Sequence, residues 1–275
     1  MLMVVATAMT VVMSAGDFDL SVGSMASLAG VIAAALFAAG APVWLGVSAA
    51  LAAGVLGGLF NGVLVAVVGI LPFVATLGTL TVFSGLAFLV SDGRTIFGRD
   101  IPEAFSGFAR AGVPLGEPDG RALSFPALTL VAFGVAAMVW IALERRRFGR
   151  WLYAIGNNAE AAMQAGIPVR ALRVAAFGVT GLGAAIAGLM YAARVASANP
   201  TQGSGLMLGA IAAVFLGQTM TARGTPRVMA TLAGVLVLGV LENGLTQMRV
   251  DSYVREILVG LIIIAAVATG ALARR

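Results

Sequence analysis

Two aspartates, Asp17 and Asp19, are the side chains of this sequence best suited to chemistry within a membrane. They stand in a polar turn, residues 16–24, between two apolar segments. A charged side chain at membrane depth is costly and commonly marks a pathway or a gate. The same carboxylates could instead cap the helix that begins near Ser21, because negative charge is stabilised at the positive end of a helix. Both interpretations stay open.

The composition excludes sites built from histidine or cysteine. The 275-residue sequence has no His and no Cys, and all 17 basic residues are Arg. Zinc, copper and iron–sulfur sites need imidazole or thiolate ligands. A catalytic aspartyl pair needs carboxylates that converge from separate elements, and no second intramembrane Asp is present to meet Asp17 or Asp19. We therefore expect neither an intramembrane enzyme nor a cofactor on this chain.

Neutral polar residues form a second group of candidates. Hydroxyls recur along the apolar segment 73–90 at Thr76, Thr79, Thr81 and Ser84, and two asparagines stand within other apolar segments. Such groups suit the passage of a neutral polyol, but threonines in helices often bond to their own backbone, and asparagines can join helices at ~1 kcal/mol each. Glu242 is expected at the external interface, with a role in the pathway as the alternative. The pathway or gating candidates are Asp17, Asp19, Ser21, Asn61, Phe73, Thr76, Thr79, Asn199 and Asn243.

The elements that must position these residues are membrane helices. The sequence is 60% hydrophobic and 11% charged, with a mean hydropathy of +1.01. Its apolar windows have the length of membrane helices and lack the alternation of barrel strands. We predict an all-α, polytopic helix bundle in the lipid bilayer, a single permease domain over residues 1–275 with eight or nine spans. The expected spans are 1–15, 25–39, 44–68, 73–90, 124–143, 174–193, 206–216, 228–245 and 257–272.

The charges predict how this bundle is oriented. Arginines are retained on the cytoplasmic side of short loops, which places residues 144–173, 223–227 and the C-terminus there. The long loop 91–123 has four Arg against five acids and is expected outside. The net charge of +5 is scattered over loop ends, so we expect no nucleic acid partner. The polar stretches 16–24 and 197–205 are either surface turns or re-entrant breaks.

Residues 144–173 are the long cytoplasmic interruption of the apolar pattern. Asn157 or Asn158 can cap a short helix there, and Gly166 with Pro168 can end it. The small residues between them leave the backbone open to contact. This segment is therefore predicted to dock a cytoplasmic protein.

An internal repeat also stands out. In the predicted topology its two copies run in opposite directions, and inverted repeats commonly build transporters. Chance similarity of two apolar, alanine- and glycine-rich segments is the alternative. After about 180 residues, Gly54-Val55-Leu56, Asn61-Gly62 and Pro72-Phe73-Val74 return as Gly234-Val235-Leu236, Asn243-Gly244 and Ser252-Tyr253-Val254.

Several of these motifs resemble those of one known family. Residues 17–24, Asp-Phe-Asp-Leu-Ser-Val-Gly-Ser, resemble the (I/F)DLSVGS signature of ribose-type ABC transporter permeases. The resemblance covers nearly the whole chain, with the motifs in the family's order. The other matching motifs are 72–79, Gly156-Asn157, Ala161-Ala162, Gly166-Ile167, 210–217 and Asn243-Gly244-Leu245.

The resemblance implies partners and roles. In that family the permease works with a separate ATP-hydrolysing subunit, an extracytoplasmic solute-binding protein and a second permease copy, as a homodimer or a heterodimer. ATP and Mg²⁺ would then bind the partner ATPase, in agreement with the absence here of a Gly-Lys-Ser/Thr phosphate-binding loop. The implied coupling residues, which would sit in a groove of that ATPase, are Gly156, Asn157, Glu160, Ala161, Ala162, Gly166 and Ile167.

Two departures from the family pattern are visible. Family members usually begin with about one more helix, so we expect this start to be truncated or misassigned. The family often has a Glu and an Asp just before its Ala-Ile-Ala-Ala run, where this chain has Met207 and Gly209. A role of those acids would be absent here or carried elsewhere.

The sequence thus predicts the permease subunit of an ABC importer in a bacterial inner membrane. The expected solute is a monosaccharide or a related polyol, moved by alternating access. An importer of branched-chain amino acids or nucleosides is the alternative in the same class. An ion-coupled secondary transporter is the alternative in another, although intramembrane acids are scarce and His is absent.

Overall fold

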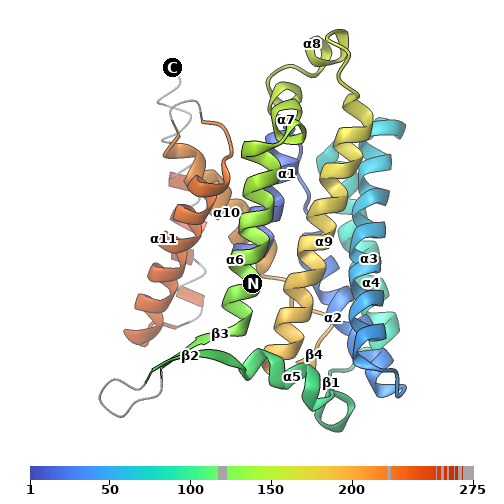
Figure 1. The fold of residues 1–275 in the computed structure, drawn as a ribbon, viewed down its shortest axis with the longest axis vertical. Helices are drawn as coiled ribbons and strands as arrows, with labels where there is room; N and C mark the ends of the chain where they lie inside the picture. Colours follow the sequence, from blue (N-terminus) through green and yellow to red (C-terminus); the bar gives the residue numbers. More distant parts are fainter. Residues whose placement is uncertain are drawn as a thin grey trace.

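The computed structural model is a bundle of long helices (Figure 1). It describes residues 1–116, 123–221 and 224–251, and scattered positions from 253 to 268. Within these residues, five helices are long and apolar enough to cross a membrane, and three shorter apolar helices accompany them. The prediction of an all-α membrane bundle is confirmed. Half of the residues of the last predicted span, 257–272, lie outside the described residues.

The helix bounds follow the predicted apolar segments closely. The short apolar helices are α1 (Leu2–Ser14), α2 (Val22–Ala38) and α10 (Leu206–Thr219). The long ones are α3 (Val43–Val63, extended by the π-helical turn η1, Leu64–Val68), α4 (Pro72–Ser91), α6 (Ala127–Trp140, extended by η4, Ile141–Arg145), α9 (Val169–Val195) and α11 (Val228–Gln247).

Both ends of the bundle carry short elements. At the end predicted to be cytoplasmic lie α7 (Arg147–Asn157) and α8 (Ala159–Gln164) (Figure 1). The opposite end carries β1 (Ile96–Phe97), η2 (Gly98–Asp100), α5 (Glu103–Arg110), β2 (Gly112–Gly116), β3 (Leu123–Pro126) and β4 (Ser197–Ala198). β1 pairs antiparallel with β4, and β2 with β3. The predicted span 124–143 begins later than expected because residues 123–126 form β3.

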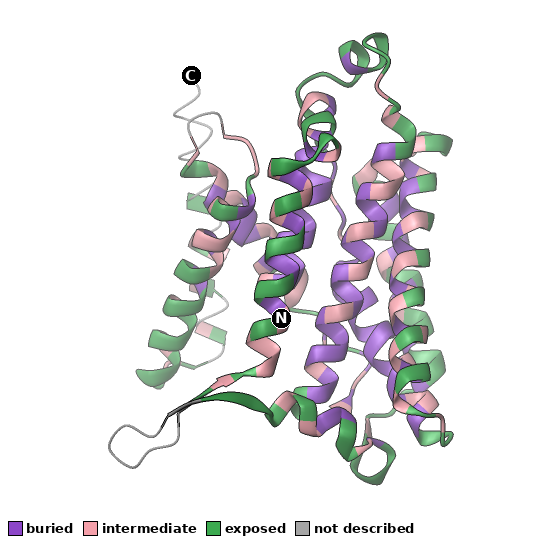
Figure 2. Cartoon of the chain, in the orientation of Figure 1, coloured by how far each residue is buried: buried purple, intermediate pink, exposed green. Residues whose placement is uncertain are grey.

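Helix α9 is the central element of the bundle. Its most apolar window is 67% buried, against 22–33% for the other four long helices (Figure 2). Gly54, Gly58 and Gly62 recur every four residues along α3 and lie against the main chain of α9. A methyl group at Gly58 would collide with the Phe177 carbonyl. Glycine at these positions therefore lets the two backbones approach closely, as in many membrane helix pairs.

The polar stretches 16–24 and 197–205 are both breaks inside the bundle. After α1 the chain reaches Arg173, near the start of α9, and then continues through a non-helical stretch and a turn to Val22. Ala26 of α2 lies against Gly188, so a rise of 1.5 Å per residue puts the start of α2 near the middle of α9. Gly203 lies between Gly23 and Ser27 of α2, roughly 15 Å from the external end of α9.

Helices α2 and α10 thus both begin at mid-depth and run toward opposite ends of the bundle. The break before α2 enters from the cytoplasmic end, and the break before α10 enters from the external end (Figure 1). The long helices that follow, α3 and α11, also run in opposite directions. This is the arrangement expected of an inverted repeat. The repeated asparagines nevertheless differ, because Asn61 is buried and Asn243 is exposed.

Candidate functional site

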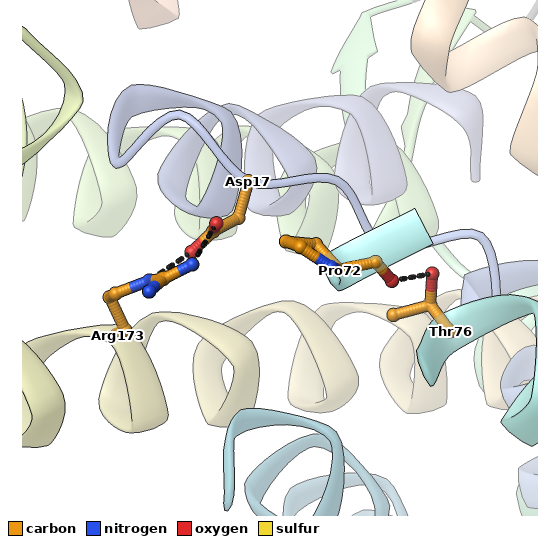
Figure 3. A network of polar contacts seen from close by, with 4 residues as sticks. All are labelled: Asp17, Pro72, Thr76 and Arg173. Atoms are coloured by element: carbon orange, nitrogen blue, oxygen red, sulfur yellow. Dashed lines mark hydrogen bonds and ion pairs between the residues drawn. The ribbon is translucent and has the colours of Figure 1, made fainter. Parts of the chain in front are cut away.

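Asp17 forms an ion pair with Arg173 at the cytoplasmic side of the first break (Figure 3). The Arg173 Nε donates to Asp17 Oδ2 at 2.7 Å, and its Nη2 donates to Oδ1. Asp17 is 3% exposed, so this bidentate contact compensates a carboxylate that water hardly reaches. The sequence analysis had assigned Arg173 to residues 144–173, the predicted coupling segment. The structure instead has it in the second turn of α9, where it ties α9 to the break.

Asp19 faces a different set of groups. It accepts the backbone N–H of Ser21 at 2.9 Å and the Ser21 hydroxyl at 2.6 Å. Asn61 on α3 donates to the Ser21 hydroxyl at 2.8 Å and approaches Asp19 at 3.5 Å. Among the described residues the Oδ1 atom of this fully buried Asn61 has no partner. Asp19 therefore stabilises the turn that leads into α2, although no side chain caps the first turn of that helix.

The threonines predicted on α4 are satisfied by their own helix. Thr76 donates to the Pro72 carbonyl at 2.8 Å (Figure 3), and Thr79 donates to the Thr76 carbonyl at 3.3 Å. Both are buried, while Phe73 is 58% exposed. This geometry is that of the backbone-bonding alternative. These residues do not border the cavity between the two breaks, described below.

The two remaining candidates, Asn199 and Asn243, also make local contacts. Asn199 donates to the Thr95 hydroxyl at 2.9 Å and accepts from the backbone N–H and the hydroxyl of Thr201. It thereby shapes the turn between β4 and α10 and ties it to the loop before β1. Asn243 is exposed and accepts from Gln247 one helical turn away. The exposed Glu242 beside it agrees with the expected interface position.

A cavity lined by both hydroxyl groups and apolar side chains lies where the two breaks meet. Its volume is about 180 Å³, and it is bordered by the start of α2, the middle of α4 and residues 200–207. Two larger cavities, of about 330 and 220 Å³, have walls that are almost wholly apolar. The sequence analysis missed most of this lining, although the spacing of Ser24 and Ser27 puts them on one face of a helix. The lining residues are Leu20, Gly23, Ser24, Ser27, Leu80, Ser84, Pro200, Thr201, Ser204 and Met207.

The predicted coupling segment includes an exposed short helix, α8, that projects from the bundle (Figures 1 and 2). Asn158 is its N-cap and accepts the backbone N–H of Ala161 at 2.9 Å. Gly166 follows at φ +79°, a left-handed conformation that glycine adopts without strain. Ala162 is buried, whereas Glu160 is exposed and available to a partner.

Further positions of the segment serve the bundle itself. Gly156 packs against the Ser14 carbonyl at the end of α1, where a side chain would collide, and Asn157 is the exposed last residue of α7. Ile167 is half-buried behind α8 and packs against the hydrophobic core.

Glu144 connects the coupling segment to the second half of the chain. It accepts the Tyr153 hydroxyl at 3.1 Å and an Arg227 guanidinium hydrogen at 2.8 Å. Burial, and then the Glu144 charge, raise the pKa of Tyr153 above its ordinary value, so the phenol stays protonated and donates. Since Arg227 is the N-cap of α11, a displacement of α7 would be passed to α11. No local pattern predicted this contact, because its partners are 83 residues apart.

Comparison with known proteins identifies the family. Residues 1–267 match the family model described as "Branched-chain amino acid transport system / permease component". The chain belongs to this permease family. It is 38% identical over 263 residues to the ribose import permease protein of Bacillus subtilis, covering 96% of this chain and 79% of the relative.

Other members of the permease family are similar over the same range. The D-allose transport system permease protein of Escherichia coli K12 is 33% identical, with 96% of this chain and 80% of the relative covered. The L-arabinose transport system permease protein of the same strain is 35% identical, with 96% and 77% covered. No solved structure matches this chain. The apolar helices and these relatives together make this permease a multi-pass membrane protein.

Proposed function

We propose that this permease is the membrane-spanning subunit of an ABC importer that moves a monosaccharide or a related polyol. The supporting observation is a hydroxyl-lined cavity without charged residues, at the point where two helix breaks meet. Substrate sites of transporters commonly lie at such discontinuous helices. The relatives named for ribose, D-allose and L-arabinose support the same class of solute.

The driving force comes from a separate ATPase that binds ATP and Mg²⁺ and docks on α8. Exposed Glu160 and the cap and stop residues of α8 present this helix to the partner. Movement of α8 is transmitted to the first break through the Asp17–Arg173 pair. It is transmitted to α11 through Glu144. A solute-binding protein delivers the sugar at the external end, a second permease copy completes the path, and the assembly works in the bacterial inner membrane by alternating access.

The test is a reconstitution of this chain with the ATPase and solute-binding protein encoded beside it. Proteoliposomes should take up one of ribose, allose or arabinose only with ATP and the loaded binding protein. Leucine and uridine serve as the competing solutes. Uptake of leucine or uridine in place of sugars would assign the importer to another solute class, and flux driven by an ion gradient without the ATPase would refute the importer.

Docking is tested by Glu160→Arg, which reverses an exposed charge without changing the backbone. We expect the affinity for the ATPase to fall about tenfold, since opposed charges that become like charges cost on the order of 1–2 kcal/mol at an interface. Glu103→Arg makes the same change on α5, at the external end, and should leave the affinity unchanged. Equal affinity of Glu160→Arg and wild type would contradict docking through this face of α8.

A further inference from the structure

One wall of the cavity between the two breaks is non-helical backbone, which is not stable in contact with lipid. Residues 199–205 are not helical, and Gly203 lies roughly 15 Å inside the bundle, about half of the ~30 Å thickness of a bilayer core. Thr201, Ser204 and Gly205 are exposed there. Exposed, non-helical backbone occurs at membrane depth only where it lines a water-filled space or meets protein. The open side of this cavity therefore faces the aqueous path or a protein partner.

The cavity also contains hydroxyl groups that the fold itself does not use. Ser24 donates to the Ser21 carbonyl, and Ser27 accepts the Gly203 N–H at 2.8 Å, so these two serve the structure. The hydroxyls of Ser84 and Ser204 have no hydrogen-bond partner among the described residues. Each hydroxyl can donate one hydrogen bond and accept others.

The remaining lining residues are apolar and match the C–H faces of a sugar ring. Leu20, Leu80, Pro200 and Met207 supply apolar walls, and no charged side chain borders the cavity. A monosaccharide carries neutral hydroxyls around a ring whose faces are C–H groups. Paired hydroxyls beside apolar walls fit that ligand, while a cation, a phosphate or an amino acid would find no counter-charge here.

We propose that this cavity is the site at which the permease contacts the sugar in transit, with Ser84 on α4 and Ser204 before α10 as its specificity-determining hydroxyls. The inference rests on the proposed function, since it names where the transported solute binds. Both hydroxyls are held at mid-depth by elements that run in opposite directions, so relative movement of α4 and α10 changes the site.

The experiment uses the reconstituted complex with one loaded binding protein throughout. Ser84→Ala and Ser204→Ala should each lower sugar uptake about fivefold, the effect of one lost hydrogen bond. Thr81→Ala is the matched control, because Thr81 is exposed on the same helix and already bonds to the Gly78 carbonyl at 2.6 Å. Stable co-purification with the ATPase reports that each variant assembles.

Deoxy analogues of the sugar then test direct contact. The ratio of parent to deoxy uptake should be about fivefold larger with wild type than with the corresponding Ser→Ala variant. The binding protein's own preference cancels, because it is the same in all four measurements.

Different results would refute the importer function and the assignment of the cavity as the sugar contact site. If wild type imports a sugar and both serine variants equal Thr81→Ala, the cavity is not the contact site and the importer function stands. Serine variants that are slower but show the full deoxy penalty for every analogue would also overturn direct contact. If wild type imports no sugar at all, both the proposed function and this inference are wrong.

Discussion

Removing Arg173 from the Asp17–Arg173 ion pair should cost more stability than removing Asp17. Only 4% of the Asp17 side chain is exposed, against 24% of the Arg173 side chain. Arg173→Met leaves a buried carboxylate without a counter-charge. Asp17→Asn leaves a guanidinium that still reaches polar surroundings. We therefore expect Arg173→Met to lower the free energy of unfolding by more than Asp17→Asn does.

The magnitudes follow from burial. Removing one partner of a buried ion pair costs about 3–5 kcal/mol, and the partial exposure of Arg173 places Arg173→Met near ~3 kcal/mol. That is roughly a hundredfold change in the ratio of folded to unfolded protein. Asp17→Asn should cost about 1 kcal/mol, because the remaining charge is better solvated. The double variant leaves no unpaired charge and should be more stable than Arg173→Met alone.

The assay is unfolding by SDS in mixed micelles at fixed ionic strength, followed by circular dichroism. Arg110→Met is the control, because it breaks an exposed pair with Glu103 in which the side chains are 63% and 91% exposed. That control should cost less than about 0.5 kcal/mol. The reasoning is refuted if Arg173→Met costs no more than Arg110→Met, or if the double variant costs the sum of its single changes.

Three further outcomes are expected. Gly58→Ala should destabilise the bundle by about 1–3 kcal/mol, because the added methyl meets a main-chain carbonyl of α9, whereas Gly78→Ala on α4 faces open space and should be neutral in the same SDS titration. Gly166→Ala should reduce stimulation of the partner ATPase and Gly166→Asn should retain more of it, since asparagine tolerates the φ of +79° better than alanine. The raised pKa of Tyr153 stabilises the fold below its ordinary value of 10.0, and this stability should be lost as pH rises above that value. A pH series of melting temperatures should therefore decline less for Tyr153→Phe, and an equal decline in both proteins would contradict the raised pKa of Tyr153.

Local signals in the sequence predicted most of the helices. The expected span 44–68 corresponds to α3 with η1, Val43–Val68, and 228–245 corresponds to α11. An apolar run of membrane length is a property of consecutive residues and needs no knowledge of the fold. The end of α8 at Gly166 was equally local, because caps and stop signals act within one helical turn.

Local signals misplaced some boundaries and roles. Helix α9 begins at Val169 instead of residue 174, and Arg173 therefore lies within it. The arginine suggested a loop, but a partner 156 residues away compensates its charge inside the bundle. Thr76 and Thr79 drew attention as a polar stripe, yet both bond to their own helix. Ser84, which the sequence grouped with these threonines, does border the cavity, and this depends on the direction its helical face takes in the bundle.

The sequence by itself determined that this chain is a membrane helix bundle, where its apolar spans lie and which family its motifs resemble. These conclusions depend on composition, on hydrophobic length and on motifs of neighbouring residues. Only the tertiary structure decided that α2 and α10 begin at mid-depth, that Asp17 meets Arg173, and that hydroxyls from three separate segments border one cavity. Such contacts join residues far apart in the chain, and it is the packing of helices around α9 that brings them together.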